Sequence, residues 1–373
     1  MYEVRGIRRR KWQEQSTGDI IVRQFDIAHE GTHLSKEFAA FLPRTLRSTS
    51  KKIRIDKSSM SIKTIGEMYQ VDGGLLSRQY KNHISDYQQW DQKYRASEYV
   101  LYKQNLGPHL SIDETSLSQG ELYTIVTNKD GKGKKGSLVA MIKGIRAEDV
   151  IFYLQKLPRS KRLKVKEITV DLSPTMMLIA KKTFPNATIV SDRFHVQRLM
   201  NEAVNDLRIS HRWEALEMEN KEIEMTKEAG RKFIPCVFEN GDTRKQLLAR
   251  SRYIILKHKS KWTDSQKRRA KILFEQYPDI EEAYQISLEL TDIYNQKISK
   301  GVALTKLAKW YDKVEKLGLK FFKSVIDTMQ NNYDTIVNFF VNRSTNASAE
   351  AFNAKIKAFR SQFRGVRDIP IFI

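Results

Sequence analysis

The sequence predicts an α/β sheet domain that is interrupted by a long all-helical insertion and preceded by a helical N-terminal region. Three observations support this α/β plus all-α fold class. From residue 108, three strand patterns follow one another in hairpin order, and a helix–strand–helix–strand series comes next. After residue 195, apolar residues recur at helical spacing through most of 196–340. Before residue 105, two short helical patterns flank a glycine-containing turn.

Basic residues dominate the charge of the chain. The 373 residues include 66 Lys and Arg against 44 Asp and Glu, which gives a formal net charge of +22. A charge of this size suits a polyanion, because each neutralised phosphate releases counterions. An anionic membrane surface is the alternative partner, but the sequence has no basic amphipathic helix with an aromatic insertion face. We therefore expect nucleic acid to be the partner.

Cys236 is the only cysteine in the sequence. A single cysteine excludes an internal disulfide, a CxxC zinc ribbon and a cysteine-bound iron–sulfur cluster, and it fits a reducing compartment. No apolar run approaches the length of a membrane span, and the charged N-terminus is not followed by an apolar segment. These features predict a cytoplasmic protein that has no membrane partner and is associated with the nucleoid when it is bound to DNA.

The N-terminal region, residues 1–105, contains a candidate helix-turn-helix at 61–84. Apolar residues in 61–69 have helical spacing, 72–74 form a turn, and 75–84 form a second helix. In a helix-turn-helix the second helix enters the major groove of DNA. A helix pair that only packs within the domain fits the same pattern. The residues predicted to contact DNA are Arg78, Gln79, Lys81 and Asn82.

Two other helices are expected in this region. The first, Ser35–Leu42, is expected to end before Pro43, because proline cannot donate a backbone hydrogen bond. The second covers residues 85–105, which are rich in Tyr and Trp, and leads into the next domain.

The elements predicted over 106–195 match the ribonuclease-H-like fold, a mixed sheet in which the first strand lies beside the fourth. The C-terminal region, 341–373, completes this domain after the insertion at 196–340. The predicted strands are His109–Thr115, Gly120–Asn128, Ser137–Lys143, Lys166–Asp171 and Ala187–Ser191, and the predicted helices between them are Ala147–Leu157 and Pro174–Phe184.

Three acidic residues are placed where they could share one crevice. Asp113 ends an inner strand, Asp171 ends the strand expected beside it, and Glu350 lies at the start of a helix that begins near Ser348. Cleaving a phosphodiester requires an activated water and positive charge near the attacking and leaving oxygens. Two hard divalent ions with oxygen ligands supply both. The pattern therefore indicates a site in which these carboxylates hold two Mg²⁺ or Mn²⁺ ions.

Each acid also has a structural interpretation. Asp171 could cap the helix that begins at Pro174, and Glu350 could oppose the dipole of its own helix. Asp192 competes for a place in the site, because it ends the fifth strand near the same edge. His195 could support the metal site, orient Asp192 or simply pack. Glu114 points to the opposite side of its strand from Asp113. The remaining secondary candidates lie on the helix face of Glu350 and are Asn353 and Lys357.

Five segments carry a family resemblance when they are taken together and in order: Ile112–Glu114, Val170–Asp171, Ile179–Ala180, Pro185–Val196 and Ser344–Lys357. With them, residues 108–370 resemble a DDE-type transposase of bacterial insertion sequences, of the group conventionally called ISL-three. Any one of these segments alone is not specific.

The resemblance implies a catalytic, metal-binding triad of Asp113, Asp171 and Glu350 with two Mg²⁺ or Mn²⁺ ions as cofactors. It implies hydrolysis of the phosphodiester at each element end, followed by attack of the freed 3′-hydroxyl on target DNA. The implied partner is double-stranded DNA, both transposon ends and target, with a homodimer or larger assembly on it.

Two features depart from the family pattern. Many similar transposases carry an N-terminal cysteine-rich zinc module, which a chain with one cysteine cannot form. The helix-turn-helix would then recognise the element ends alone or together with another protein. The sequence also ends at Ile373, soon after the last motif, where relatives commonly continue, which leaves a truncated copy open.

Two other function classes remain open at this point. A DNA-binding protein without catalysis, either a degenerate transposase or a repressor, would use the same helix-turn-helix and basic surface. A ribonuclease-H-like nuclease that acts on RNA hybrids would have the same carboxylate site, but it explains the long helical insertion less well.

Overall fold

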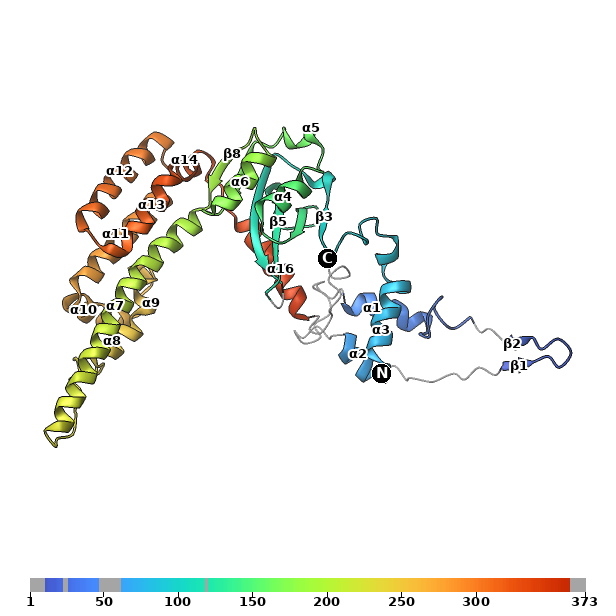
Figure 1. The fold of residues 1–373 in the computed structure, drawn as a ribbon, viewed down its shortest axis with the longest axis horizontal. Coiled ribbons are helices and arrows are strands. Elements are labelled where there is room, and N and C mark those ends of the chain that lie inside the picture. Colours follow the sequence, from blue (N-terminus) through green and yellow to red (C-terminus); the bar gives the residue numbers. More distant parts are fainter. Residues whose placement is uncertain (1–10, 23–25, 47–61, 118–119, 363–373) are drawn as a thin grey trace.

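The computed structural model describes residues 11–22, 26–46, 62–117 and 120–362 of the chain. Its centre is a six-stranded mixed sheet (Figure 1) with the order β3 (Tyr99–Leu101), β6 (Leu138–Lys143), β5 (Leu122–Asn128), β4 (His109–Ser116), β7 (Glu167–Val170) and β8 (Thr188–Ser191). The strands from β3 to β4 pair antiparallel, whereas β4, β7 and β8 are parallel. The first and fourth predicted strands, β4 and β7, are therefore neighbours, as expected.

The edge strand β3 corrects the expectation of a helix over 85–105. That segment instead contains two short 3-10 helices, η2 (Asp86–Gln89) and η3 (Lys103–Asn105), with β3 between them. Tyr99 packs into the hydrophobic cluster on one face of the sheet, and Val100 packs into the cluster on the other. Consecutive residues that are buried on opposite faces have the period of a strand, and this two-sided burial outweighs any helical preference of the segment.

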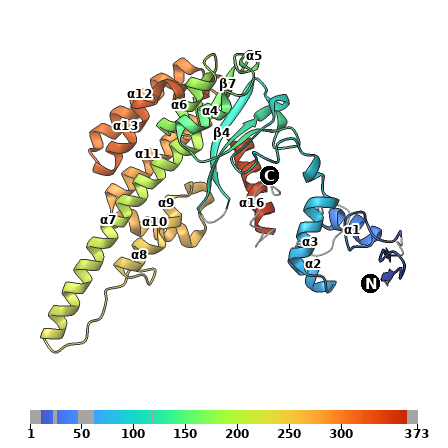
Figure 2. The ribbon, with the colours of Figure 1, turned by 45° about the vertical axis from the view of Figure 1, so that its right-hand side comes forward.

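The two faces of the sheet are covered by different parts of the chain. On one face lie α4 (Ala147–Leu154) and α6 (Pro174–Thr183), whose buried residues share a hydrophobic cluster with fully buried Leu110 and Ile112 of β4. The short α5 (Arg159–Arg162) comes between α4 and β7 in the chain and buries no residue. On the other face lies α16 (Ala347–Gln362), whose half-buried Phe352 and Ile356 pack against Tyr123 and its neighbours. The two helical layers lie on opposite sides of the sheet (Figure 2). Because α16 covers one face, residues of 347–362 meet strands more than 200 positions earlier in the sequence.

The helical insertion begins with α7 (Arg193–Glu228), a single helix of 36 residues that leads away from the sheet (Figure 1). Its predicted apolar stripe from Val196 to Leu207 is buried against later helices, which form a core around Trp310 and Tyr294. No helix in the part of the chain that the structure describes is long and apolar enough to span a membrane. The later helices of the insertion are α8 (Arg244–Arg250), α9 (Arg252–Ile255), α10 (Asp264–Gln276), α11 (Pro278–Asn295), α12 (Lys300–Leu317), α13 (Lys323–Asn331), α14 (Tyr333–Val337) and α15 (Phe339–Asn342).

The N-terminal part contains the expected helix pair, α2 (Ile62–Met68) and α3 (Gly73–Gln79), while Ser61 lies outside the described residues. Asp72 caps α3, because its Oδ1 accepts a hydrogen bond from the Leu75 amide at 2.6 Å. The chain then continues as a short π-helix, η1 (Tyr80–Ile84).

Three other elements belong to the N-terminal part: α1 (Lys36–Leu46), β1 (Lys11–Gln13) and β2 (Ile20–Val22). The prediction that the first helix ends before Pro43 is wrong. A proline removes one intrahelical hydrogen bond, to the carbonyl of Ala39, but fully buried Leu42 fixes the helix just before it.

Candidate active site

Three aspartates occupy equivalent positions on three adjacent parallel strands. The sheet aligns His109, Glu167 and Thr188 across β4, β7 and β8, and Asp113, Asp171 and Asp192 each follow one of them by four residues. When this register is continued, the three aspartates form one row, and their side chains point to the same face as α16 because side-chain direction repeats every two residues. Neighbouring strands lie about 4.8 Å apart. The row therefore places three carboxylates close together at one edge.

Local structure explains why β7 and β8 end at this row. The Oδ1 atom of Asp171 accepts a hydrogen bond from the Ser173 amide at 3.0 Å, and α6 begins at the next residue, Pro174. Asp192 is the N-cap of α7, with its Oδ1 accepting from the Phe194 amide at 3.5 Å. Both aspartates therefore turn the chain from a strand into a helix, and they still face the same crevice.

The helix α16 brings two further residues to the row. Asn353 is buried, and its Nδ2 donates a hydrogen bond to the Oδ2 atom of Asp113 at 2.6 Å. The other oxygen of Asp113, Oδ1, accepts from the Glu114 amide at 2.9 Å. Glu350 lies one helical turn before Asn353 and has an exposed side chain. Of the three residues expected on one face of α16, Asn353 contacts Asp113, while Glu350 and Lys357 are exposed one turn before and one turn after it.

The carboxylates of the site influence one another electrostatically. Burial raises the pKa of Asp113, and the negative charges of Asp171 and Asp192 raise it further, against the Glu114 amide and His195. Loss of solvation also raises the pKa of Glu350, with contributions from Asp192 and Asp113. Like charges that raise one another's pKa lie close in space. Asp113 is thus the carboxylate that couples to both Asp171 and Glu350.

Asp192 is the most deeply buried aspartate of the row, with 1% of its surface exposed. Burial raises its pKa, and His195 and the amides of Asn346 and Phe194 oppose the shift. The Oδ2 atom of Asp192 is buried without a hydrogen-bond partner among the described residues, and so is Oδ1 of Asn353. Two unpaired oxygen acceptors within a set of mutually repelling carboxylates fit a hard divalent cation, which prefers oxygen ligands.

The acidic side chains of the row do not form a closely spaced set of metal ligands. Within residues 11–22, 26–46, 62–117 and 120–362, no three or more His, Cys, Asp or Glu side chains lie together closely enough to hold a metal. Hydrogen bonds from Glu114 and Asn353 orient the two oxygens of Asp113, and each oxygen keeps a second lone pair that could bind a cation.

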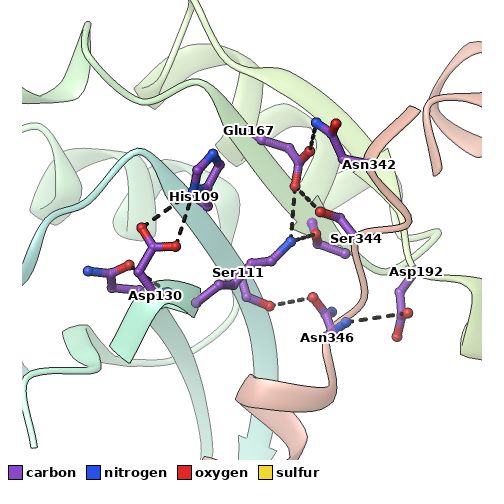
Figure 3. Close-up of polar contacts among 11 residues, drawn as sticks. His109, Ser111, Asp130, Glu167, Asp192, Asn342, Ser344 and Asn346 are labelled. Carbon is purple, nitrogen blue, oxygen red and sulfur yellow. Dashed lines mark hydrogen bonds and ion pairs between the residues drawn. The ribbon is translucent and has the colours of Figure 1, made fainter. Parts of the chain in front are cut away.

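Residues that sequence reasoning missed connect α16 to the row. The amide of Asn346 donates to Oδ1 of Asp192 at 3.4 Å, and Ser111 Oγ donates to Oδ1 of Asn346 (Figure 3). Both Ser111 and Asn346 are buried. The available signal was the spacing of Ser111, a polar residue inside an apolar strand, two positions before Asp113 and on the same face.

The secondary candidates fall into two groups. His195 is half-buried and lies near the row, because its charge would lower the pKa values of Asp113, Asp192 and Glu350. Glu114 is half-buried on the opposite side of β4 from Asp113, and burial raises its pKa, with Asp171 and Asp113 adding to the shift. Lys357 is exposed one turn beyond Asn353 on α16.

The four residues predicted to contact DNA differ in how far their side chains are exposed to solvent. Arg78 and Asn82 are exposed, and half-buried Lys81 places its ammonium 4.4 Å from the centre of the Tyr87 ring. The side chain of Gln79 is 7% exposed and faces the interior. Gln79 follows Leu76 by one helical turn, so the apolar face that anchors α3 turns it inward. The helix therefore offers Arg78 and Asn82, but not Gln79, to an external partner.

Comparison with known proteins places this geometry in a family. No curated protein matches the chain. Among solved structures, the Drosophila P element transposase strand transfer complex matches 89% of this chain and 100% of that chain, with 11% identity and a TM-score of 0.30. The sequence profile of the ISL-three DDE family, described as Transposase, matches residues 110–373. That match covers well over half of the sequence, so the chain belongs to the ISL-three group of DDE transposases.

Proposed function

We propose that the chain cleaves the ends of an insertion sequence and joins them to target DNA with divalent metal ions, and that Asp113, Asp171 and Glu350 are its catalytic residues. The sheet, with α16 on one face, would be a ribonuclease-H-like catalytic domain formed by residues 106–195 and 341–373. Residues 363–373 lie outside the described part of the chain. The helices of 196–340 would be an insertion in this domain.

The observation that carries this proposal is the contact between the aspartate row and α16. Asp113 and Asp171 lie in equivalent positions on adjacent parallel strands, and Asn353 bonds α16 to Asp113 one turn away from Glu350. The charges of Asp192 and Asp113 also contribute to the raised pKa of Glu350, which supports the same grouping. Asp113, Asp192 and Glu350 have raised pKa values, and perturbed pKa values cluster at functional sites.

Asp113, Asp171 and Glu350 would hold two Mg²⁺ or Mn²⁺ ions, which when bound supply positive charge beside the phosphate oxygens on which negative charge develops. The chain contributes the positions of the ligands. The backbone amides of Glu114 and Ser173 orient Asp113 and Asp171, each through one hydrogen bond to Oδ1. His195 would hold Asp192 and orient the site from the start of α7.

The DNA itself would be bound by two parts of the chain. In the N-terminal region, 1–105, α3 would present Arg78 and the following η1 would present Asn82 to the element ends. The excess of 66 Lys and Arg over 44 Asp and Glu would attract the phosphate backbone without sequence preference. Strand transfer joins two ends, so we expect a dimer or larger assembly on DNA.

The proposal is tested with DNA that carries the element's ends. Purified protein should nick this DNA only when Mg²⁺ or Mn²⁺ is present. Asp113→Asn keeps the volume of the side chain and one oxygen acceptor but removes the charge that a cation requires. Cleavage should fall by about a hundredfold to a thousandfold, because removal of one central electrostatic group from a catalytic site costs about 2.7–4 kcal/mol. Binding to the same DNA should stay unchanged.

Glu148→Gln is the matched control, because Glu148 is an exposed carboxylate of the same domain on α4. This variant should cleave as the parent protein does. Normal cleavage by Asp113→Asn would show that the assignment of the triad is wrong. Salt-sensitive binding without any metal-dependent cleavage would favour the second candidate, a DNA-binding protein without catalysis, which the basic charge of the chain also supports.

A further inference from the structure

A buried carboxylate that is not part of the aspartate row holds the chain just before α16. Glu167 of β7 is 4% exposed. Its Oε1 accepts a hydrogen bond from Lys129 Nζ at 3.0 Å and another from the Ser344 hydroxyl, and its Oε2 accepts from Asn342 Nδ2 at 2.9 Å (Figure 3). A buried charge is tolerated only when it is paired and hydrogen-bonded. Glu167 therefore fixes two residues of the segment before α16 to the sheet.

The ionised state of Glu167 is stabilised by these partners. Burial alone would raise its pKa, but hydrogen bonds from Ser344 and Asn342 and the charge of Lys129 outweigh burial and lower the pKa. Lys129 is itself held in place, because its ammonium also donates to Thr169 Oγ1 at 2.7 Å. The contact is thus a charged network with several donors rather than a single surface ion pair.

The same segment is bonded to the helical insertion through Arg343. The guanidinium of Arg343 donates to the carbonyls of Tyr294 at 2.8 Å and Gln296 at 2.6 Å, at the C-terminal end of α11. A cation at a helix C-terminus is favourable because carbonyl groups there lack helical partners. Arg343 also has a left-handed backbone conformation, with φ of +53°. The turn and the side chain together direct the chain from α15 toward the sheet.

The last residue of the segment begins α16. The Asn346 side chain accepts from Ser111 of β4, and the Asn346 carbonyl accepts the Glu350 amide at 2.9 Å, the first turn of the helix. Residues 342–346, which we call the joint, therefore contact β4, β7, Asp192 and α11, and Glu350 follows within one turn.

We infer that the joint sets the position of α16, and hence of Glu350, relative to Asp113, with Glu167 and Arg343 as positioning residues. Glu167 fixes the joint to the sheet, and Arg343 connects it to the helical insertion. A displacement of α11 is therefore passed to Glu350 through five residues. This inference rests on the proposed role of Glu350 in catalysis, but the position of α16 can be measured without any cleavage.

The position of α16 is measured as a distance across the sheet. In a Cys236→Ser background, spin labels are attached at Lys181→Cys on α6 and Ala354→Cys on α16, two exposed positions on opposite sides of the sheet. The parent protein should give one narrow distance distribution by pulsed electron paramagnetic resonance. Glu167→Gln keeps the side-chain volume but removes the charge opposite Lys129, and it should broaden the distribution or shift it.

Two further changes keep the inference testable if Glu167→Gln does not fold. The double change Asn342→Ala with Ser344→Ala removes two donors to Glu167 and leaves its pair with Lys129 intact. Arg343→Lys keeps the charge but cannot span two carbonyls as a guanidinium does. Each should broaden the distance distribution.

Single-turnover cleavage should fall about tenfold or more in the joint variants, because a misplacement of about 1 Å in a catalytic group costs up to about a hundredfold. DNA affinity should stay unchanged. Val150→Ala serves as the control for general destabilisation, because Val150 is fully buried in α4 on the opposite face. It should lower Tm and leave the distance distribution narrow.

The inference would be overturned by an unchanged, narrow distribution in every folded variant among Glu167→Gln, Asn342→Ala with Ser344→Ala, and Arg343→Lys. Broadening in Val150→Ala to the same extent would overturn it as well, since the effect would then report stability alone. Failure of the proposed function gives a different result. In that case Asp113→Asn would still cleave DNA, while the joint variants would still displace α16.

Discussion

Asp192→Asn should stabilise the protein when no divalent cation is present. Asp192 is buried in the aspartate row, and its pKa is raised by burial against the opposing influence of His195 and two backbone amides. A carboxyl whose pKa is higher in the folded state than in the unfolded state binds more protons when folded. Stability is then lost as pH rises from the unfolded pKa, about 4 for Asp, through the folded pKa. At about pH 7 the ionised Asp192 therefore destabilises the fold.

Burial is the largest cause of the raised pKa of Asp192, and its charge also repels those of Asp113 and Glu350. Unit charges separated by the spacing of neighbouring strands, about 4.8 Å, would repel by about 3.5 kcal/mol at an effective dielectric constant of 20, which is an upper bound. Solvent reaches half-buried Asp113 and exposed Glu350, which reduces the repulsion. Asparagine retains an oxygen that can accept from the Asn346 and Phe194 amides. We expect a net gain of about 1 kcal/mol, or about 2 °C in Tm for a chain of this size.

Thermal unfolding of the parent and Asp192→Asn proteins in a chelator measures this gain. The variant should melt at a higher temperature at about pH 7 and lose its advantage at about pH 4, where both side chains are neutral. A variant that melts at a lower temperature than the parent at neutral pH would refute the reasoning. It would show that the hydrogen bonds of the ionised carboxylate outweigh the repulsion in the row.

Three further predictions concern the cation, α16 and DNA. Mg²⁺ at about ten times its Kd should stabilise the protein by about 1.4 kcal/mol at neutral pH. The stabilisation should be smaller at about pH 5, because protonated carboxylates do not bind a cation. If Mg²⁺ raised the Tm of Asp113→Asn as much as that of the parent protein, the assignment of the site would be contradicted. Phe352→Ala should cost about 2 kcal/mol, roughly half the cost at a fully buried site, and should speed hydrogen exchange in α16, whereas unchanged exchange there would place the helix elsewhere. Arg78→Ala should weaken DNA binding, and if Arg78 contacts a phosphate it should lower the magnitude of the slope of log K against log salt by about 1. Gln89→Ala changes an exposed residue nearby and should leave the DNA affinity and this slope unchanged.

The sequence predicts the strands around the site well, because their burial leaves a clear pattern. β4 and β7 were expected within one or two residues of their observed ends, since each contains an apolar run followed by an acidic residue. Asp113, however, was expected at the end of its strand and lies three residues before the end of β4, which continues to Ser116. Their neighbouring positions followed from the order of elements. The apolar face of α16 was also predictable, because Phe352 and Ile356 are four residues apart and both pack on the sheet.

Features that depend on tertiary contacts were not predictable. β3 was missed because three residues are too few to show a strand pattern in the sequence. Its strand conformation depends on packing against both faces of the sheet. Gln79 was expected at the surface, but it shares a helix face with buried Leu76.

The role of Glu167 has a partial signal in the sequence. Glu167, Thr169 and Asp171 alternate along one strand, so one face of β7 is polar although the strand is buried. This alternation indicates that polar groups cover that face. The covering residues, Asn342 and Ser344, lie 175 or more positions away in the sequence, so only the fold identifies them.

The most direct measurement is the anomalous difference map of crystals of the protein with end-bearing DNA and Mn²⁺. The account predicts ions bound by oxygens of Asp113, Asp171 and Glu350 at about 2.0–2.3 Å. Ions held instead by other acids, or a Glu350 side chain that takes no part in binding them, would contradict it.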